Sequence, residues 1–284
     1  MIPVVIFTLF NKNKNKVICF MRGKIGEDLE SLGHGFLSWF CIKIEKQLLR
    51  ICDAVFCNGK DTALYVKQKL ERNSIVLPNG VDFGRFANPK LEEENEWIRK
   101  IKGLKEQKYK IIVTVATLRD VKGIKYLIEA ASYLQQENNG VNYRIIFVGK
   151  GDPTAYRVYG KNLGVEDNLL FVGEQKTVPS FLCLADVAVA ISGGGGVSQA
   201  AVEMMAAGKP VIAWNNLTYS QLITHGKTGH LVKDRDSKAL ADGIEFIINN
   251  PDYAFTLSEN AQKEASNYDW SVIADQFIKE FTKV

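Results

Sequence analysis

Residues 187–213 read VAVAISGGGGVSQAAVEMMAAGKPVIA, and this stretch decides the fold. It opens with an apolar run that predicts a strand over Val187–Ile191, and it closes with a second such run over Val211–Ala213. Between them, after four consecutive glycines, the apolar spacing predicts a helix over Ser198–Ala207. A strand, a crossover helix and a second buried strand form the unit from which parallel sheets are built.

The same alternation extends to both sides of this unit, from Lys110 onward. Near-continuous apolar strands separated by amphipathic stretches indicate a parallel sheet with helices on both faces. The sequence therefore predicts a complete, doubly wound, Rossmann-like α/β domain. Its other expected strands are 111–115, 144–148 and 169–172, and its other expected helices are 89–107, 124–136, 154–163, 178–185 and 252–266.

The first 80 residues also have an α/β pattern, but a shorter one. Pro78-Asn79-Gly80 then interrupts it and marks a domain boundary. The repetitive run Asn11–Lys16 is typical of a solvated hairpin-like loop. The expected strands are 4–9, 17–21, 54–57 and 74–77, and the expected helices are 37–51 and 62–69.

Composition excludes several classes of protein. A net charge of +4 is too small to argue for nucleic acid. The apolar start Ile2–Phe10 lacks the flanks of a signal peptide and is too short to span a bilayer, so we expect a strand and a cytoplasmic protein. With three histidines and no CxxC pair, a metal site is not expected, and the cysteines are interpreted as buried thiols. They are Cys19, Cys41, Cys52, Cys57 and Cys183.

The glycine loop Gly193–Gly196 indicates close approach of backbone to a ligand, because both of its flanks belong to packed elements. Free amides at the start of the following helix attract phosphate, aided by the helix dipole. Ligands of open α/β sheets bind at the carboxyl ends of the strands, where this loop lies. The loop therefore predicts a phosphate site.

Glu203 sharpens this prediction, since it is the only charged residue between Val187 and Gly208. A lone carboxylate on such a helix either faces solvent or is kept for a ligand, because burying it without a partner is too costly. Two ribose hydroxyls would satisfy it.

Three stretches carry a resemblance to a known family. Residues 203–213, EMMAAGKPVIA, resemble the signature of retaining glycosyltransferases of family 4, which have the GT-B fold. Residues 78–82, PNGVD, resemble that family's interdomain turn, and residues 121–130 its phosphate-binding segment. The resemblance covers about residues 17–284 and is strongest from Pro78 on. Further matching segments are 147–151, 170–173 and 226–232.

The resemblance implies roles for individual residues. Lys122 would neutralise the donor diphosphate, with Arg119 beside it, and Glu203 would hold the ribose. The loop near Glu174 and Gln175 would lie against the base. The positions implied in nucleotide-sugar binding are Thr117, Gly149, Gly173, Glu174, Gly195, Gly196, Val197, Ser198 and Glu203, and the catalytic ones are Lys122, Arg119 and Glu203.

The activity implied is that of a hexosyltransferase-type glycosyltransferase acting with retention of configuration. It would move a sugar from a UDP-, GDP- or ADP-sugar to a glycan or lipid-linked acceptor, with no cofactor and no essential metal. The implied domains are residues 1–80 on the acceptor side, 81–266 for the nucleotide sugar, and 267–284 as a helix that crosses back. Fold alone leaves open another GT-B enzyme, such as an epimerase or phosphorylase.

Three departures from the family pattern lead to a second hypothesis. Gly195 stands where the family has a glutamate that touches the sugar, and Thr117 where it has a phosphate arginine, for which Arg119 could substitute. The chain also starts about halfway through the family's acceptor domain. The alternative is therefore a non-autonomous or inactive donor-binding subunit, completed by a separate polypeptide that carries the N-terminal half.

The N-terminal region has two features of its own. Arg22 follows an expected strand, and it either contacts the sugar or its phosphate or simply ends the strand at the surface. The expected helix 37–51 is amphipathic and basic. Packing against the sheet is the favoured use of its apolar face, with peripheral contact with the inner membrane face as the alternative.

The pair Asp234 and Asp236 has the DxD pattern that binds manganese in other glycosyltransferases. Because it follows a strand and precedes a helix, Asp236 is better interpreted as a helix cap.

Overall fold

The computed structural model describes residues 4–11, 14–31, 33–137, 142–193 and 195–283 of the 284-residue chain. Its contacts group into two compact units. Unit 1 comprises Met1–Gly80, Gly194–Val197 and Trp270–Val284, and unit 2 comprises Val81–Gly193 and Ser198–Asp269. Each unit has a sheet of its own.

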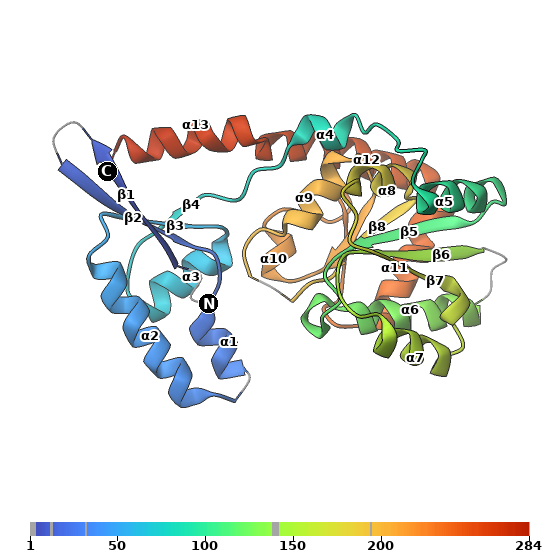
Figure 1. Cartoon of the computed structure of the whole chain (residues 1–284), viewed down its shortest axis with the longest axis horizontal. Coiled ribbons are helices and arrows are strands. Elements are labelled where there is room, and N and C mark those ends of the chain that lie inside the picture. The colour runs from blue at the N-terminus through green and yellow to red at the C-terminus, as the bar shows by residue number, and fades with distance from the viewer. Residues whose placement is uncertain (1–3, 12–13, 32, 138–141, 194, 284) are drawn as a thin grey trace. The chain divides into compact units, whose positions relative to one another are not determined.

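Unit 2 is built on a six-stranded parallel sheet in the order β10-β9-β8-β5-β6-β7 (Figure 1). The strands β5, β8 and β9 lie inside the sheet, and their apolar side chains are buried on both faces, as near-continuous apolar runs require. The strands are β5 (Lys110–Val115), β6 (Tyr143–Val148), β7 (Leu169–Gly173), β8 (Val187–Ala190), β9 (Val211–Trp214) and β10 (His230–Val232).

Helices cover both faces of this sheet (Figure 1). On one face α6 packs against α7 and α11, and on the other α5 packs against α8, and α9 against α12. The helices are α4 (Phe83–Ala87), α5 (Glu96–Glu106), α6 (Ile124–Glu137), α7 (Thr154–Asn162), α8 (Val178–Leu184), α9 (Gln199–Ala206), α10 (Leu217–Ser220), α11 (Ser237–Asn249) and α12 (Pro251–Ala265), with short 3-10 turns at Asp120–Lys122, Glu166–Asn168 and Ser266–Tyr268.

Two caps explain where helices of unit 2 begin. The Asp236 carboxylate accepts the Ala239 N–H at 3.0 Å at the start of α11, which confirms its predicted role as a cap. Asn95 caps α5 by accepting the N–H of Trp97 at 2.9 Å. The prediction of a helix from residue 89 was therefore wrong, and the acidic run 92–94 lies before the helix.

Unit 1 has a four-stranded sheet in the order β1-β2-β3-β4. The β1–β2 pair is antiparallel and the other pairs are parallel. The helix α1 is not among the helices predicted from the sequence. The elements are β1 (Val4–Asn11), β2 (Lys14–Met21), β3 (Ala54–Cys57), β4 (Ile75–Val76), α1 (Ile25–Ser31), α2 (Gly35–Arg50), α3 (Lys60–Lys69) and α13 (Trp270–Phe281).

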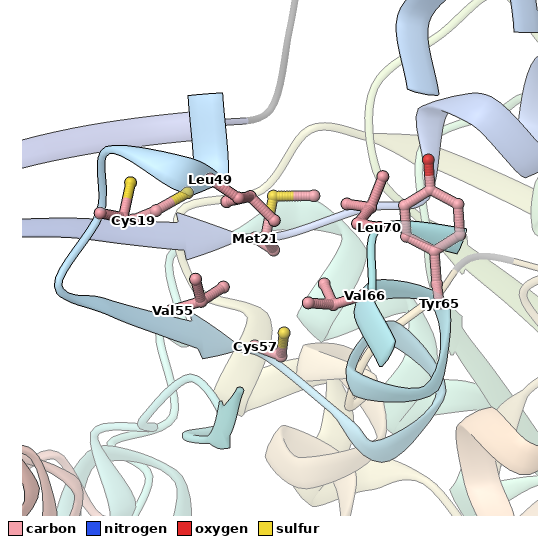
Figure 2. Packing of buried hydrophobic residues seen from close by; sticks show 9 residues of the cluster. Cys19, Met21, Leu49, Val55, Cys57, Tyr65, Val66 and Leu70 are labelled. Carbon is pink, nitrogen blue, oxygen red and sulfur yellow. The ribbon is translucent and has the colours of Figure 1, made fainter. Parts of the chain in front are cut away.

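The two faces of this sheet carry separate apolar cores, because alternate strand residues point to opposite faces. On one face Leu49 of α2 packs in a core that includes the buried thiols of Cys19, Cys52 and Cys57. Figure 2 shows this core. On the other face α13 packs Phe277 against Phe20 and Phe56 of the strands. Cys41 and Cys183 are only half-buried, so the expectation of buried thiols was wrong for these two.

Helix α2 uses only part of its apolar surface for packing. Leu49 is buried, whereas Phe36 is 77% exposed and Trp39 is 54% exposed, with Phe40 similar. The Lys43 ammonium lies 4.5 Å from the centroid of the Trp39 ring. The favoured prediction, that the apolar face of this helix packs against the sheet, was therefore wrong for its first half.

The α/β class and the parallel sheet predicted from the sequence are confirmed. Within the described part of the chain, every helix is too short or too polar to cross a bilayer.

Candidate donor site

Lys122 lies at the carboxyl end of β5, in the 3-10 turn that precedes α6. Its ammonium donates to the hydroxyl of Ser192, the residue before the glycine loop, at 3.1 Å. Gly123, with φ of 73°, makes this approach possible, because a Cβ there would lie 2.4 Å from the Ile191 carbonyl oxygen. The site therefore places a cation where the sequence predicted a phosphate.

Burial lowers the pKa of Lys122, and the nearby charge of Arg119 lowers it further. Arg119 itself is exposed, and its N–H donates to the Thr117 carbonyl. A half-buried ammonium with a second cation beside it gains from a bound anion, since the anion relieves both the desolvation and the repulsion. Thr117, Arg119 and Lys122 all lie in the segment between β5 and α6.

Tyr219, from α10, holds both flanks of the glycine loop. Its hydroxyl accepts the Ser192 N–H at 2.6 Å and also forms a hydrogen bond with the Ser198 side chain. The side chain is fully buried, and this burial raises the pKa of Tyr219 to about 12. Sequence reasoning missed Tyr219, because the hydrogen bonds of a single tyrosine outside any motif leave no pattern.

Ser198 begins α9 and caps it, with its hydroxyl accepting the Ala201 N–H at 3.4 Å. Within unit 1, the Gly196 N–H donates to the Asp61 carboxylate at 2.9 Å, and the Val197 N–H donates to the Asn58 carbonyl at 3.0 Å. The sequence had predicted that these two amides are free for a phosphate, and here they are hydrogen-bonded to protein instead.

Gly195 lies against the same carboxylate. A Cβ at this position would lie 3.0 Å from Asp61 Oδ2 and 3.2 Å from the Lys24 side chain. The longer side chain of the family's glutamate would therefore require Asp61 and Lys24 to move.

Glu203 lies one turn into α9 and is half-buried. Burial raises its pKa, while a hydrogen bond from Gln199 at 3.5 Å and the positive charge of Arg85 act in the opposite direction. The carboxylate thus has weak partners, which leaves it available to accept stronger hydrogen bonds from hydroxyl groups of a ligand.

Gly149 joins the strand ends that surround the site. With φ of 151°, it approaches the preceding loop so closely that a Cβ would lie 2.0 Å from the Ala116 carbonyl oxygen. Its N–H donates to the Gly173 carbonyl at 2.8 Å. Gly173 has φ of 73° with open space around it, and Glu174 is exposed. The ends of β5, β6 and β7 are thereby held together.

Arg22 lies in unit 1 and is exposed, with its guanidinium donating to the Asn79 side chain. This contact uses one end of the guanidinium, and a sugar or phosphate contact of Arg22 stays a prediction. Among the described residues, no three His, Cys, Asp or Glu side chains are grouped so that they could hold a metal ion.

Comparison with known proteins adds a family. Residues 95–264 match the family described as glycosyl transferases group 1. The chain is 32% identical over 190 residues to the Bacillus subtilis (strain 168) protein named "Putative glycosyltransferase EpsD", covering 66% of this chain and 49% of that protein. It is 25% identical over 247 residues to D-inositol 3-phosphate glycosyltransferase of Corynebacterium urealyticum, covering 83% and 58%.

Among solved structures, the chain resembles that of Anabaena Alr3699/HepE in complex with UDP, with a TM-score of 0.74 and 23% identity over 86% of this chain and 68% of that one. This likeness confirms the predicted GT-B-like fold. The chain spans about half the length of the curated relatives it matches.

Proposed function

The chain belongs to the glycosyl transferases group 1 family, and we propose that it transfers a hexose from a nucleotide-diphosphate sugar to an acceptor hydroxyl with retention of configuration. The observation that carries this proposal is the Lys122 ammonium, which is half-buried and bonded to Ser192 at the start of the glycine loop. We assign residues 81–266 to the donor, residues 1–80 to the acceptor side, and residues 267–284 to a helix of the acceptor side.

Lys122 and Arg119 neutralise the diphosphate in this proposal. When the bond between the sugar and the diphosphate breaks, negative charge grows on the leaving oxygen. An ammonium that is already desolvated stabilises this charge more than one in water does. Its lowered pKa marks the ground-state cost, which binding of the diphosphate removes.

Glu203 holds the ribose, and the strand ends joined by Gly149 and Gly173 hold the base. The Anabaena relative has been solved with UDP and with UDP-glucose, which makes a UDP-sugar the first donor to test here. No cofactor and no essential metal enter this mechanism, because positioning and charge stabilisation supply the rate.

The test is a titration of UDP, GDP and ADP into the protein, followed by calorimetry and repeated with Glu203→Ala. We expect one nucleotide to bind at least tenfold more tightly than the others, and Glu203→Ala to weaken it at least tenfold through loss of the ribose hydrogen bonds. Glu166→Ala, which changes an exposed glutamate of the same unit, is the matched control and should bind as the unchanged protein does. An unaltered affinity in Glu203→Ala would refute the site.

The alternative function is donor binding without turnover, with a separate polypeptide completing the acceptor side. Gly195 favours it, because the family's sugar-contacting glutamate is replaced and Asp61 lies against this position. Mass spectrometry of products from a panel of donors and acceptors separates the two. Nucleotide binding with neither transfer nor donor hydrolysis would favour the binding subunit.

For the acceptor we propose a glycan or lipid-linked molecule reached from the cytoplasmic face of a membrane. The support is helix α2, whose exposed Phe36, Trp39 and Phe40 lie beside Lys43, a combination suited to anionic lipid surfaces. Flotation with vesicles of anionic and of neutral phospholipids tests this. We expect binding to anionic vesicles that is lost in Trp39→Ser with Phe40→Ser, and equal recovery of both proteins would contradict it.

A further inference from the structure

Unit 2 contains a cavity of about 270 Å³, and one of its lining residues, Arg85, is also the cation that acts on Glu203. It lies between the segment that follows α4 and the start of α8. Three of its lining side chains are cations and one is an acid, so its local charge is positive. The lining residues are Arg85, Asn88, Lys90, Glu92, Lys176, Thr177, Pro179 and Ser180.

Thr177 is the informative residue of this wall. It occupies the cap position of α8, yet its hydroxyl makes no cap hydrogen bond. The residue is only 8% exposed, and its Oγ1 is shielded from solvent and has no hydrogen-bond partner among the described residues. Because an unsatisfied buried hydroxyl lowers stability, a ligand that this hydroxyl reaches by rotation of the side chain would explain a threonine here.

The walls of the cavity are braced by hydrogen bonds of other groups. The Arg85 guanidinium donates to the Lys176 carbonyl at 2.7 Å, which ties the two sides together. The Ser180 hydroxyl donates to the Lys90 carbonyl at 3.0 Å. Among the described residues, the ammonium groups of Lys90 and Lys176 have no hydrogen-bond or ion-pair partner.

We propose that this cavity binds the phosphate group of a small anionic ligand, at a site separate from the one at Lys122. The ammonium groups of Lys90 and Lys176 supply charge, and the Thr177 hydroxyl, after rotation about χ1, and the Asn88 amide donate hydrogen bonds. The cavity is larger than a phosphate ion, so a phosphate ester of a small polyol fits it better than free phosphate. Glu92 disfavours ligands of higher negative charge.

The experiment measures thermal stabilisation against the concentration of inorganic phosphate and of glycerol 3-phosphate, at constant ionic strength. It is carried out on Lys122→Ala, so that the donor site does not contribute. We expect saturable stabilisation, with an apparent dissociation constant that rises at least fivefold on adding either Lys90→Ala or Thr177→Val. Lys100→Ala, an exposed lysine outside the cavity, is the control and should leave it unchanged.

Thr177→Val also shows whether a loss of binding could be caused by a loss of stability. Because the hydroxyl makes no hydrogen bond in the empty protein, this nearly isosteric change should leave the melting temperature without phosphate equal or higher. Tighter binding of glycerol 3-phosphate than of phosphate assigns the cavity to a phosphate ester, and the reverse assigns it to free phosphate. The proposal is wrong if the stabilisation disappears in Lys122→Ala, or if neither cavity variant changes the apparent dissociation constant. Neither result bears on nucleotide binding at Glu203, which has a titration of its own.

Discussion

The two units differ in how much of their apolar surface they bury. In unit 2, the strands β5, β8 and β9 are buried along almost their whole length, between helices on both faces. In unit 1, α2 buries Leu49 but leaves Phe36 and Trp39 largely exposed. Monomeric proteins rarely expose aromatic residues in such a cluster without a partner. The sheet of unit 2 is thus covered on both faces, whereas the first half of α2 in unit 1 leaves a cluster of aromatic side chains uncovered.

Of the substitutions that test this difference between the units, Lys122→Met should have the largest effect. In Lys122→Met, the turnover with the preferred donor should fall about 100- to 1000-fold, the loss typical of removing one charge-stabilising group. The melting temperature should stay within a few degrees, since the Ser192 hydroxyl is the one hydrogen-bond partner of the ammonium among the described residues. Chromatography of the product formed over time gives the turnover rate, with Lys100→Met as the control. A rate within threefold of the unchanged protein would place the chemistry elsewhere.

The contrast inside α2 can be tested by two truncations. Leu49→Ala should lower the free energy of unfolding by about 2–5 kcal/mol, because it opens a cavity in the core shown in Figure 2. Phe40→Ala should change it by less than about 0.5 kcal/mol, because the ring is exposed. Urea unfolding followed by circular dichroism gives both values. Equal losses would show that the exposed face of α2 is covered in solution, and the comparison of the units would fail.

The next prediction concerns the support that Tyr219 gives to the glycine loop of the candidate site. Tyr219→Phe removes the hydroxyl that accepts the Ser192 N–H, and we expect a loss of about 1 kcal/mol in unfolding free energy together with weaker nucleotide binding. Tyr109→Phe is a matched control, since the Tyr109 ring contacts Arg144 through its face. Calorimetric titration and thermal melts report the two effects separately. Full nucleotide affinity in Tyr219→Phe would mean that the glycine loop does not need this support.

The smallest effect concerns pH. Burial raises the pKa of Glu203, and the ionised carboxylate accepts hydrogen bonds from two ribose hydroxyls more strongly than the neutral acid does. Nucleotide affinity should therefore fall as the pH is lowered from neutrality through this raised pKa, by less than about tenfold between pH 7 and pH 5. Glu203→Gln should bind more weakly and with a flatter pH profile. A profile that is equally steep in both proteins would assign the titration to another group.

Much of unit 2 could be predicted, because its strands are nearly continuous apolar runs and its ligand loops follow them. The glycine loop and Glu203 were predicted from this pattern, whereas Lys122 was predicted from the resemblance to the family. Tyr219 could not be predicted, because a buried hydroxyl that joins two loops depends on tertiary distances alone. The pairing of the Gly196 and Val197 amides with Asp61 and Asn58 is equally non-local.

The errors in unit 1 have a related cause. Amphipathic spacing shows that a helix has an apolar face, but it does not show what covers that face. In α2, Trp39 and Leu49 both belong to the apolar pattern of the helix, yet Trp39 is exposed and Leu49 is buried. The start of α5 was placed too early, because the cap at Asn95 lies inside an otherwise helix-forming run.

The distribution of thiols gives the protein a built-in reporter. Cys19, Cys52 and Cys57 lie in the core of unit 1, and burial raises the pKa of all three, so alkylating reagents should reach them only when that unit opens. Cys183 is the one cysteine of unit 2. Alkylation followed by peptide mass spectrometry would therefore time the opening of unit 1 without any engineered label, and would show whether a lipid surface or a partner protein slows it.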